Sequence, residues 1–403
     1  MSDLTSTLLI TLTGRDRPGV TSSTLATLAT AGVDVVDLEQ IVLRGRLVLG
    51  LLVTAPEDDS DLRALLEETA RRLDMTIELE EGSNGLPNQR RHRSRVTVIG
   101  TPLTADAMAR ITTGIAEAGA NIDRIIRLAA YPVTAFDLHV SGADKAALRE
   151  ALALIAADAG LDISVQSATL HARGQRLIVM DVDSTLIQGE VIEMIAAHAG
   201  CEAEVAEITE RAMRGELDFE QSLRERVKLL AGVPASALDE VYDQISLTPG
   251  ARTMVRTLRR LGYRFAIVSG GFSQITDRLA GELGIHFARA NELEIIDGRL
   301  TGNVVGKVID RAGKADALRE YAAELGLPLT STIAIGDGAN DLDMLAAAGL
   351  GVAYNAKPAV RSAAETAINV PYLDTIMYLL GFTREEIEAA DADEGFVTPS
   401  PAV

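Results

Sequence analysis

Short apolar runs in the second half of the 403-residue sequence each end in residues that could do chemistry. The runs and the residues that follow them are 177–180 before Asp181 and Asp183, 265–268 before Ser269, and 332–335 before Asp337. Lys314 stands in a helical segment after an expected strand over 304–308. Ligands of an open parallel sheet bind beyond the carboxyl ends of its strands, so we expect these side chains to form one site.

The carboxylates of this set favour a bound cation. Asp181 and Asp183 are two residues apart, so in extended backbone they point the same way. Clustered carboxylates repel each other and raise each other's pKa unless a cation neutralises them. Together with Asp337 they offer hard oxygen ligands, which suit Mg²⁺. The five histidines are scattered through the sequence without the spacing of a zinc site.

The same residues could transfer a phosphoryl group. Lys314 supplies positive charge, Ser269 a hydroxyl, and Gly270 a backbone N–H that no side chain obstructs. One aspartate could attack phosphorus and form an acyl phosphate, and a second could protonate the leaving oxygen and later deprotonate water. The sequence has no P-loop pattern, so nucleotide binding of that type is not supported. Each motif alone is a weak signal, but their order after apolar strands indicates function.

The segments that must position these residues predict an α/β fold. From about 172 to 380, short apolar runs bounded by Gly or Asp alternate with helical stretches, which is typical of a Rossmann-like parallel sheet. Residues 190–246 lack such runs and are predicted to be a helical cap inserted after the first strand. A cap excludes water and commits the substrate, so we expect specificity to reside there.

The N-terminal half is predicted to duplicate a ferredoxin-like βαββαβ module of about 75 residues. The first strand over 8–13 resembles the one over 95–100, and the stretch 32–41 aligns with 119–128. The expected domains are 1–82 and 96–170 for the two modules, 83–95 for a polar linker with a basic cluster, 171–382 for the hydrolase domain, and 383–403 for an acidic, flexible tail.

The composition limits which classes of binding partner and which cellular compartment we expect. A net charge of −20 argues against nucleic acid or an anionic membrane as the main partner. The N-terminus lacks the basic region of a secretory signal, and no apolar run approaches the roughly 20 residues needed to span a bilayer. Cys201 is the single cysteine, so no intrachain disulfide forms, which fits a reducing compartment. We therefore expect a cytoplasmic protein.

The motifs resemble those of the haloacid dehalogenase superfamily. DVDSTL over 181–186, SGG over 269–271, Lys314 and GDGANDLDM over 336–344 match its four motifs in order. The DxDST form with GDGxND is similar to that of the phosphoserine phosphatases. The repeated modules resemble ACT domains, which bind small effectors in many enzymes of amino-acid metabolism. That second likeness rests on the pattern of elements and on GRDRPG over 14–19.

The resemblance implies a role for each motif residue. Asp181 would be the nucleophile, and Asp183 would be the general acid and then the general base. Asp181 and Asp337 would bind Mg²⁺, with the backbone carbonyl of Asp183 as a further ligand. Asp341, one helical turn after Asp337, would support these ligands. The residues expected to hold the phosphoryl oxygens, or to lie close to them, are Ser269, Gly270, Lys314 and Asn340.

O-phospho-L-serine is the expected substrate because the cap offers both charges that its amino-acid groups need. By the resemblance, Glu190 would bind the ammonium group and Arg226 the carboxylate, which a guanidinium can grip with two hydrogen bonds. Met213 and Phe219 would form an apolar lid. The alternative roles are structural: Glu190 in the first turn of a helix, Arg226 in an i,i+4 ion pair, and the two apolar residues in the cap core.

The two modules are expected either to regulate the enzyme or to assemble it. Gly14 and Asp16, in the turn after the first strand, form the candidate effector site, with serine as the expected effector. The second module lacks the matching Asp-Arg-Pro-Gly segment. In the alternative, both modules serve only to form a homodimer through edge strands or helix faces. The sequence does not decide between these roles.

Other functions stay open at this stage. The same chemistry could act on another phosphorylated metabolite or on a phosphoprotein, and a mutase shares the aspartyl-phosphate step. A different class is an amino-acid sensor with an inactive phosphatase domain, but the intact set of Asp181, Asp183, Ser269, Lys314 and Asp337 argues against it. With phosphoserine as substrate, the reaction is expected to be the last step of serine biosynthesis.

Overall fold

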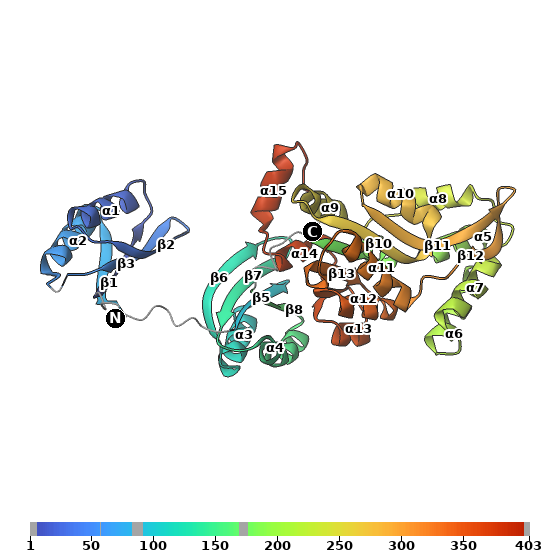
Figure 1. Ribbon diagram of the computed structural model, residues 1–403, viewed down its shortest axis with the longest axis horizontal. Helices are drawn as coiled ribbons and strands as arrows, with labels where there is room; N and C mark the ends of the chain where they lie inside the picture. Colours follow the sequence, from blue (N-terminus) through green and yellow to red (C-terminus); the bar gives the residue numbers. More distant parts are fainter. Residues whose placement is uncertain (1–5, 57, 83–91, 169–175, 399–403) are drawn as a thin grey trace. The chain divides into compact units, whose positions relative to one another are not determined.

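The structure is a computed structural model that describes residues 6–56, 58–82, 92–168 and 176–398. The chain divides into two compact units, Met1–Arg90 and Arg91–Val403 (Figure 1). Residues 83–91 of the expected linker lie outside the described residues. Within the described ranges, no helix combines the length and the hydropathy that crossing a membrane requires.

The first unit is a four-stranded antiparallel sheet packed on two helices. In chain order its elements are β1 Thr7–Arg15, α1 Val20–Thr30, β2 Val35–Leu43, β3 Arg46–Thr54, α2 Ser60–Arg72 and β4 Met75–Glu81. The strands lie in the order β2-β3-β1-β4, the βαββαβ arrangement that the sequence predicted. Leu8, Ile10 and Leu12 alternate with less buried residues along β1, so one face of this strand packs on the helices.

The second module repeats this arrangement at the start of the second unit. Its elements are β5 Arg93–Gly100, α3 Ala105–Glu117, β6 Asn121–Ala129, β7 Thr134–Ser141, α4 Lys145–Ala159 and β8 Asp162–Ser167. The strand order β6-β7-β5-β8 matches the first module strand for strand, which confirms the duplicated fold. Thr104 and Asp144 cap α3 and α4 by accepting a backbone N–H three residues later, which explains where these helices begin.

The C-terminal domain is built on a seven-stranded sheet. Its strands are β9 Leu177–Met180, β10 Arg264–Phe272, β11 Phe287–Ile296, β12 Arg299–Val305, β13 Thr332–Gly336, β14 Leu350–Tyr354 and β15 Thr366–Ile368. The order is β12-β11-β10-β9-β13-β14-β15, and the pairings are parallel except that of β11 with β12. Ile178 and Met180 pack into one hydrophobic core and Leu177 and Val179 into another, so both faces of the sheet are covered, as predicted for a Rossmann-like domain.

Helices precede, connect or follow these strands. They are α9 Ala251–Arg260, α10 Ser273–Leu283, α11 Arg311–Glu324, α12 Leu342–Ala347, α13 Pro358–Ala363 and α14 Ile376–Leu379. The insertion between β9 and β10 holds α5 Val191–Ala199, α6 Glu202–Met213, α7 Phe219–Leu229 and α8 Ala237–Gln244, so it is helical as predicted (Figure 1). Asp218 and Gln221 form a reciprocal capping box, which sets the start of α7 at the neighbouring Phe219.

The expected strand over 304–308 is wrong in its bounds. The observed strand β12 ends at Val305 and runs antiparallel to β11. Gly306 has a φ of 73°, a left-handed conformation at which the chain turns instead of extending further. Asp297 and Gly298 also have positive φ, and together they make the tight turn that joins β11 to β12 as a hairpin.

The second module packs directly on the C-terminal domain, because its strand β8 lies beside β15. The hydroxyl oxygens of Ser164 and Thr366 are 2.9 Å apart. Asp162 accepts hydrogen bonds from the backbone and the side chain of Asn369 at 2.7 and 2.6 Å. Ile99 belongs to the hydrophobic core of the C-terminal domain. The second module and that domain therefore form one folded body.

The C-terminal segment is anchored on the same domain as far as it is described. Its helix α15 spans Arg384–Asp393. Asp391 is fully buried and accepts hydrogen bonds from Arg256 at 3.0 Å and from Arg260 at 2.9 Å. Thr398 returns to the same carboxylate with its hydroxyl at 2.7 Å. These contacts hold part of a segment that was expected to be flexible.

Candidate active site

Residues from three separate motifs meet at one edge of the sheet. Strand β9 lies between β10 and β13. Asp181 follows β9, Asp337 follows β13, and Ser269 lies near the carboxyl end of β10. The backbone N–H of Asp181 donates to the carbonyl of Ile335 at 2.9 Å, which holds the ends of β9 and β13 together. This convergence is the one expected for an open parallel sheet.

Lys314 lies between two buried carboxylates. Its Nζ is 2.6 Å from Oδ2 of Asp181 and 2.7 Å from Oδ1 of Asp341, and its side chain is 1% exposed. Burial alone would lower the pKa of Lys314, but Asp181 and Asp341 raise this pKa on balance, so the lysine stays charged. Asp341 also accepts from the backbone N–H of Gly338 at 3.0 Å, so it holds both the lysine and the loop after β13.

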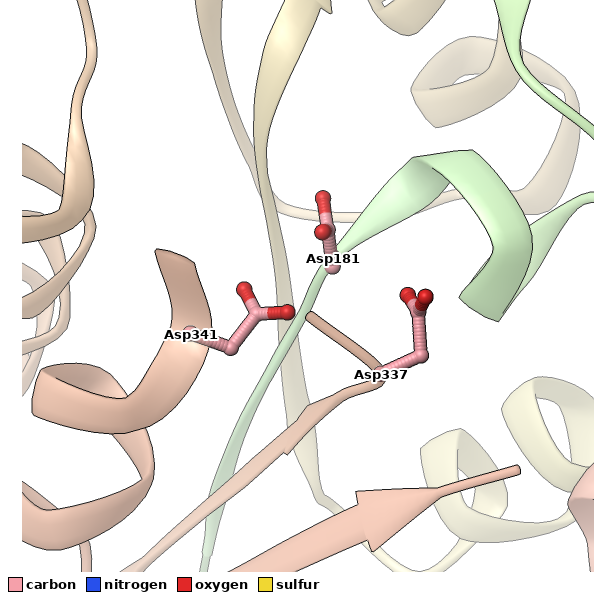
Figure 2. A group of neighbouring side chains, drawn as sticks. All are labelled: Asp181, Asp337 and Asp341. Carbon is pink, nitrogen blue, oxygen red and sulfur yellow. The ribbon is translucent and has the colours of Figure 1, made fainter. Parts of the chain in front are cut away.

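Asp181, Asp337 and Asp341 form an acidic cluster. Figure 2 shows their side chains where β9 and β13 end, and one oxygen from each lies within 4.8 Å of the others. Burial raises the pKa of Asp181 well above its ordinary value; Asp341 adds to this rise and Lys314 opposes it. Burial also raises the pKa of Asp337 to about 6. Crowded carboxylates that face a single lysine fit a divalent cation with oxygen ligands.

Asp183 is held by donors at both carboxylate oxygens. Its Oδ1 accepts from the backbone N–H of Val191 at 2.9 Å, and its Oδ2 accepts from the hydroxyl of Ser269 at 3.2 Å. Burial raises the pKa of Asp183, which suits a group that must carry a proton. The carboxylate of Asp183 is not part of the acidic cluster, and the role of its backbone carbonyl as a metal ligand stays a prediction. Ser184 has a φ of 56°, so the chain turns sharply after Asp183.

The loop over Ser269, Gly270 and Gly271 is fixed by a residue that motif reasoning missed. The backbone N–H of Gly271 donates to Oγ of Ser269 at 2.7 Å. Asn291, which is 2% exposed, donates from Nδ2 to the carbonyl of Gly270 and accepts at Oδ1 from the backbone N–H of Ile309, both at 2.8 Å. It thus ties this loop to the segment that leads into α11. Both partners are distant in sequence, so no local signal marks Asn291.

Two threonines fix the position of Asp337. Thr185 donates from Oγ1 to Oδ1 of Asp337 at 2.9 Å, and Thr248 donates from Oγ1 to the carbonyl of Thr185 at 2.6 Å. The motif DxDST contains Thr185, so its presence there is a usable sequence signal. Thr248 follows the cap without any motif, and its role is visible only in the folded chain.

A cavity of about 430 Å³ opens between the sheet edge and the cap, a size that suits a small ligand. The predicted site residues that line it are Asp181, Asp183, Glu190, Phe219, Arg226, Gly270, Asp337 and Asn340. Ser269 and Lys314 are buried and lie beneath its wall, and Asp341 is buried beside Lys314. The strand ends and the cap therefore enclose one common space.

The cap contributes two side chains of opposite charge to this cavity. Burial, and then the charge of Asp183, raises the pKa of Glu190 to about 7, and the hydroxyl of Ser184 donates to Glu190 at 3.0 Å. Arg226 donates from Nε to the carbonyl of Ser222 at 3.3 Å, and burial lowers its pKa. The i,i+4 ion pair considered for Arg226 is not formed, because the residues four positions before and after it are Ser222 and Leu230. Glu190 precedes α5 without making a capping hydrogen bond.

Phe219 touches the loop over Ser269, Gly270 and Gly271 directly. A Cβ atom at Gly270 would come within 2.8 Å of Cζ of Phe219, so the edge of the ring rests on the glycine backbone. Glycine is needed here because a side chain would collide with the ring. Met213 is the last residue of α6, and its side chain lies outside the described ones.

The candidate effector residues lie in the first unit. Gly14 lies in β1, where a Cβ atom would collide with Sδ of Met75. The end of this methionine side chain is flexible, so packing does not by itself require glycine here. The backbone N–H of Asp16 donates to the carbonyl of Gly45 at 2.8 Å. An effector role for Gly14 and Asp16 stays a prediction.

Known protein families match both halves of the chain. The haloacid dehalogenase-like hydrolase family matches residues 178–346. ACT domain families match residues 6–80 and 92–166, which correspond to the two βαββαβ modules. These matches agree with the resemblances drawn from the motifs.

Named relatives are similar to this chain over most of its length. The phosphoserine phosphatase of Streptomyces coelicolor is 61% identical over 387 residues, which cover 96% of this chain and 94% of that protein. A phosphoserine phosphatase of Mycobacterium tuberculosis is 52% identical over 395 residues, with 96% of each chain covered. The crystal structure of a probable phosphoserine phosphatase from Vibrio cholerae, in unliganded form, is 36% identical with a TM-score of 0.58 and covers 74% of this chain and 88% of that one. The chain therefore belongs to the phosphoserine phosphatase family of haloacid dehalogenase-like hydrolases, with two ACT domains before the phosphatase domain.

Proposed function

We propose that the protein hydrolyses O-phospho-L-serine to L-serine and phosphate, with Mg²⁺ and through an aspartyl-phosphate on Asp181. One observation carries this proposal: a single cavity is lined by Asp181 and Asp183 from the sheet edge and by Glu190 and Arg226 from the cap. Phosphoserine presents a phosphate, an ammonium and a carboxylate, and the cavity offers a group suited to each. The full-length relatives from Streptomyces and Mycobacterium are named for this activity.

Asp181 and Asp183 would divide the chemistry between them. An oxygen of Asp181 attacks phosphorus, a P–O bond forms there, and the ester P–O bond to serine breaks. Asp183 gives a proton to the leaving serine oxygen, a role that its raised pKa supports. In the second step Asp183 takes a proton from water, the water oxygen attacks phosphorus, and phosphate leaves with Asp181 restored.

Lys314 and the loop after β10 would prepare the site for this transfer. Lys314 holds Oδ2 of Asp181 at 2.6 Å, and the backbone N–H of Val182 holds Oδ1 at 2.7 Å, so the nucleophile is oriented, and the charge of Lys314 opposes the rise in its pKa. The charge of Lys314 and the donors of Ser269 and Gly270 would offset charge on the transferring phosphoryl group.

Asp181 and Asp337 would hold Mg²⁺, together with the backbone carbonyl of Asp183. When bound, the cation supplies positive charge to the phosphoryl oxygens and neutralises the crowded carboxylates. Asp341 accepts hydrogen bonds from Lys314 and from the backbone of Gly338, so it would help to hold the groups around the metal ligands in position. The acidic cluster of Asp181, Asp337 and Asp341 supports a hard cation of this kind.

The cap would recognise the amino-acid part of the substrate. Glu190 would bind its ammonium group and Arg226 its carboxylate, with Phe219 as an apolar lid over the loop at Gly270. An apolar lid discriminates weakly against one extra methyl group, by about 1–3 kcal/mol. We therefore expect phosphothreonine to be a poorer substrate but not an excluded one.

The ACT domains would bind an amino acid, with serine as the proposed effector, and would join two chains in a homodimer. Strand β2 supports assembly through a sheet edge, because Val36, Ile41 and Leu43 are 53%, 56% and 72% exposed. The reaction would supply L-serine in the cytoplasm, as the last step of its biosynthesis. The net charge of −20 supports a small-molecule substrate over nucleic acid or an anionic membrane.

The test is phosphate release from L-phosphoserine in Mg²⁺ or in EDTA, with a panel of other phosphate monoesters. We expect metal-dependent preference for phosphoserine and a loss of about a thousandfold or more in Asp181→Asn, which keeps its shape but loses its nucleophile. Arg319→Gln, which changes an exposed arginine paired with Asp316, is the control. Metal-dependent turnover of another ester would contradict the roles of Glu190 and Arg226. Absence of turnover with every ester would favour an inactive sensor.

A further inference from the structure

A second cavity, of about 520 Å³, shares no lining residue with the catalytic one. It lies among α9, the start of β10, the end of α10 and the segment after α15 (Figure 1). The basic side chains that line it are Arg252, Arg256, Arg259, Arg260, Arg264 and His286. The acidic ones are Glu282 and Glu394. In a chain of net charge −20, this is a local reversal of the overall charge.

Some of these basic side chains form ion pairs with carboxylates of the same chain. Arg252 forms an ion pair with Glu282, and Arg256 and Arg260 both contact the buried carboxylate of Asp391. These pairs attach the C-terminal segment and the end of α10 to α9. They explain why three of the arginines are present without any ligand.

Arg259 and Arg264 are different, because neither has a carboxylate within ion-pair distance in the part of the chain that the structure describes. Arg259 donates from Nη1 to the carbonyl of Leu283 at 3.0 Å. Arg264 contacts Nε2 of His286 from its Nη1 at 2.8 Å. Both side chains are exposed at the cavity. A guanidinium carries five N–H donors, so each has donors left for a ligand.

His286 indicates what kind of ligand would complete the cluster. Its Nδ1 faces the backbone N–H of Phe265 at 3.2 Å, and its Nε2 faces the guanidinium of Arg264, which can only donate. Burial, and then Arg264 and Arg259, lowers the pKa of His286 and keeps the ring neutral. A neutral imidazole carries one N–H, so it cannot accept at both nitrogens. The cluster therefore holds more donors than acceptors, and a ligand group that only accepts hydrogen bonds would complement it.

We propose that this cavity binds the phosphate group of a small molecule between Arg259 and Arg264, with His286 beside them. The planar fork of arginine matches phosphate oxygens, and two such forks suit a doubly charged group. The volume suits a small ligand, and Leu283 and Phe396 offer apolar contacts to an organic part. This site does not depend on the catalytic cavity or on the proposed reaction.

Equilibrium dialysis with radiolabelled orthophosphate tests the site in the full-length protein, in EDTA and at constant ionic strength. The double variant Arg259→Gln/Arg264→Gln is compared with the wild type and with Arg319→Gln, so that binding at the catalytic cavity is common to all three. We expect the double variant to bind one phosphate per chain at least about tenfold more weakly than the wild type. Arg319→Gln should bind like the wild type. Equal binding by the double variant and the wild type would overturn the proposal.

Crystals of the wild-type protein soaked in tungstate give a test that does not rely on a variant folding. We expect anomalous density among Arg259, Arg264 and His286; density confined to the catalytic cavity would overturn the proposal. Displacement of the label then identifies the source of the phosphate group. Stronger displacement by phenyl phosphate than by orthophosphate indicates an organic ester, and the reverse order indicates free phosphate. Either order supports a phosphate site.

Discussion

The two ACT domains share a strand order but differ in what covers the outer face of the sheet. Leu12 in β1 and Val98 in β5 occupy matching positions, and each packs in the core of its own domain. The next residues face the other way. Thr13 is only partly buried, whereas Ile99 is 1% exposed and belongs to the core of the phosphatase domain. The residues paired with them on the next strand differ in exposure in the same way. Val48 in β3, beside Thr13, is 43% exposed, whereas Ala135 in β7, beside Ile99, is fully buried.

This difference teaches that one arrangement of strands and helices can serve two structural roles. An antiparallel sheet needs a cover on one face only, so the first domain is complete with its own two helices. The second has both faces covered, and its outer face is continuous with the phosphatase core. A change on the outer face of the second ACT domain should therefore reach the phosphatase domain.

The largest expected effect on this comparison comes from Ile99→Ala. Truncation of a side chain in the shared core should lower the free energy of unfolding of the phosphatase domain by about 2–5 kcal/mol. The matched variant Thr13→Ala removes a partly exposed side chain, and we expect a change of about 0.5 kcal/mol or less. Urea unfolding, followed by circular dichroism and by residual phosphatase activity, measures both. Equal losses in the two variants would break the comparison.

The cap is a third region for comparison. A change at Glu190 in the cap should alter the kinetics of the reaction and not the stability of the protein. The pKa of Glu190 is raised from 4.5 to about 7 by burial and by Asp183, so Glu190 is mostly protonated at pH 6 and mostly ionised at pH 8. Only the ionised form attracts the substrate ammonium. We expect kcat/KM for phosphoserine to rise about tenfold with pH through this range.

Glu190→Gln is the matched control for this pH profile. It keeps the shape of the side chain and removes its titration, so the rise near pH 7 should disappear. The substrate phosphate titrates near pH 6 as well, and that part of the profile should remain. An unchanged profile in Glu190→Gln would show that Glu190 does not meet the ammonium group.

The smallest expected effect comes from the edge strands β8 and β4, which occupy matching places in the two ACT domains. Ser164→Ala in β8 leaves the hydroxyl of Thr366 without its partner at 2.9 Å, and we expect a loss of about 1 kcal/mol in the unfolding of the phosphatase domain. Glu78 in β4 occupies the matching position of the first ACT domain and is exposed. Glu78→Ala should leave that unfolding transition unchanged. Thermal unfolding followed by circular dichroism separates the two outcomes.

Much of the catalytic site could be predicted because its residues directly follow apolar runs. Parallel strands end at one edge of a sheet, so Asp181, Ser269 and Asp337 had to converge once the strands were recognised. Partnerships between distant residues were harder to predict. Asn291 gives no local signal, since its partners at Gly270 and Ile309 lie on other segments.

The hairpin of β11 and β12 shows a second limit. The sequence predicted a strand near the right place, but its extent and direction depend on turns at Gly298 and Gly306 with positive φ. A glycine permits such a conformation without requiring it, so the same residues are compatible with a strand that continues past Gly306. The pairing with β11 is what selects the hairpin.

By itself, the sequence determined the kind of chemistry, the parallel sheet that carries it and the duplicated modules before it, because these follow from local patterns of apolar, polar and glycine residues. Only the tertiary structure decided that the second ACT domain shares a core with the phosphatase domain and that Arg259, Arg264 and His286 surround one cavity. Local patterns show which face of a strand or helix is apolar or charged. Which segment packs against that face is settled by contacts between residues far apart in the chain.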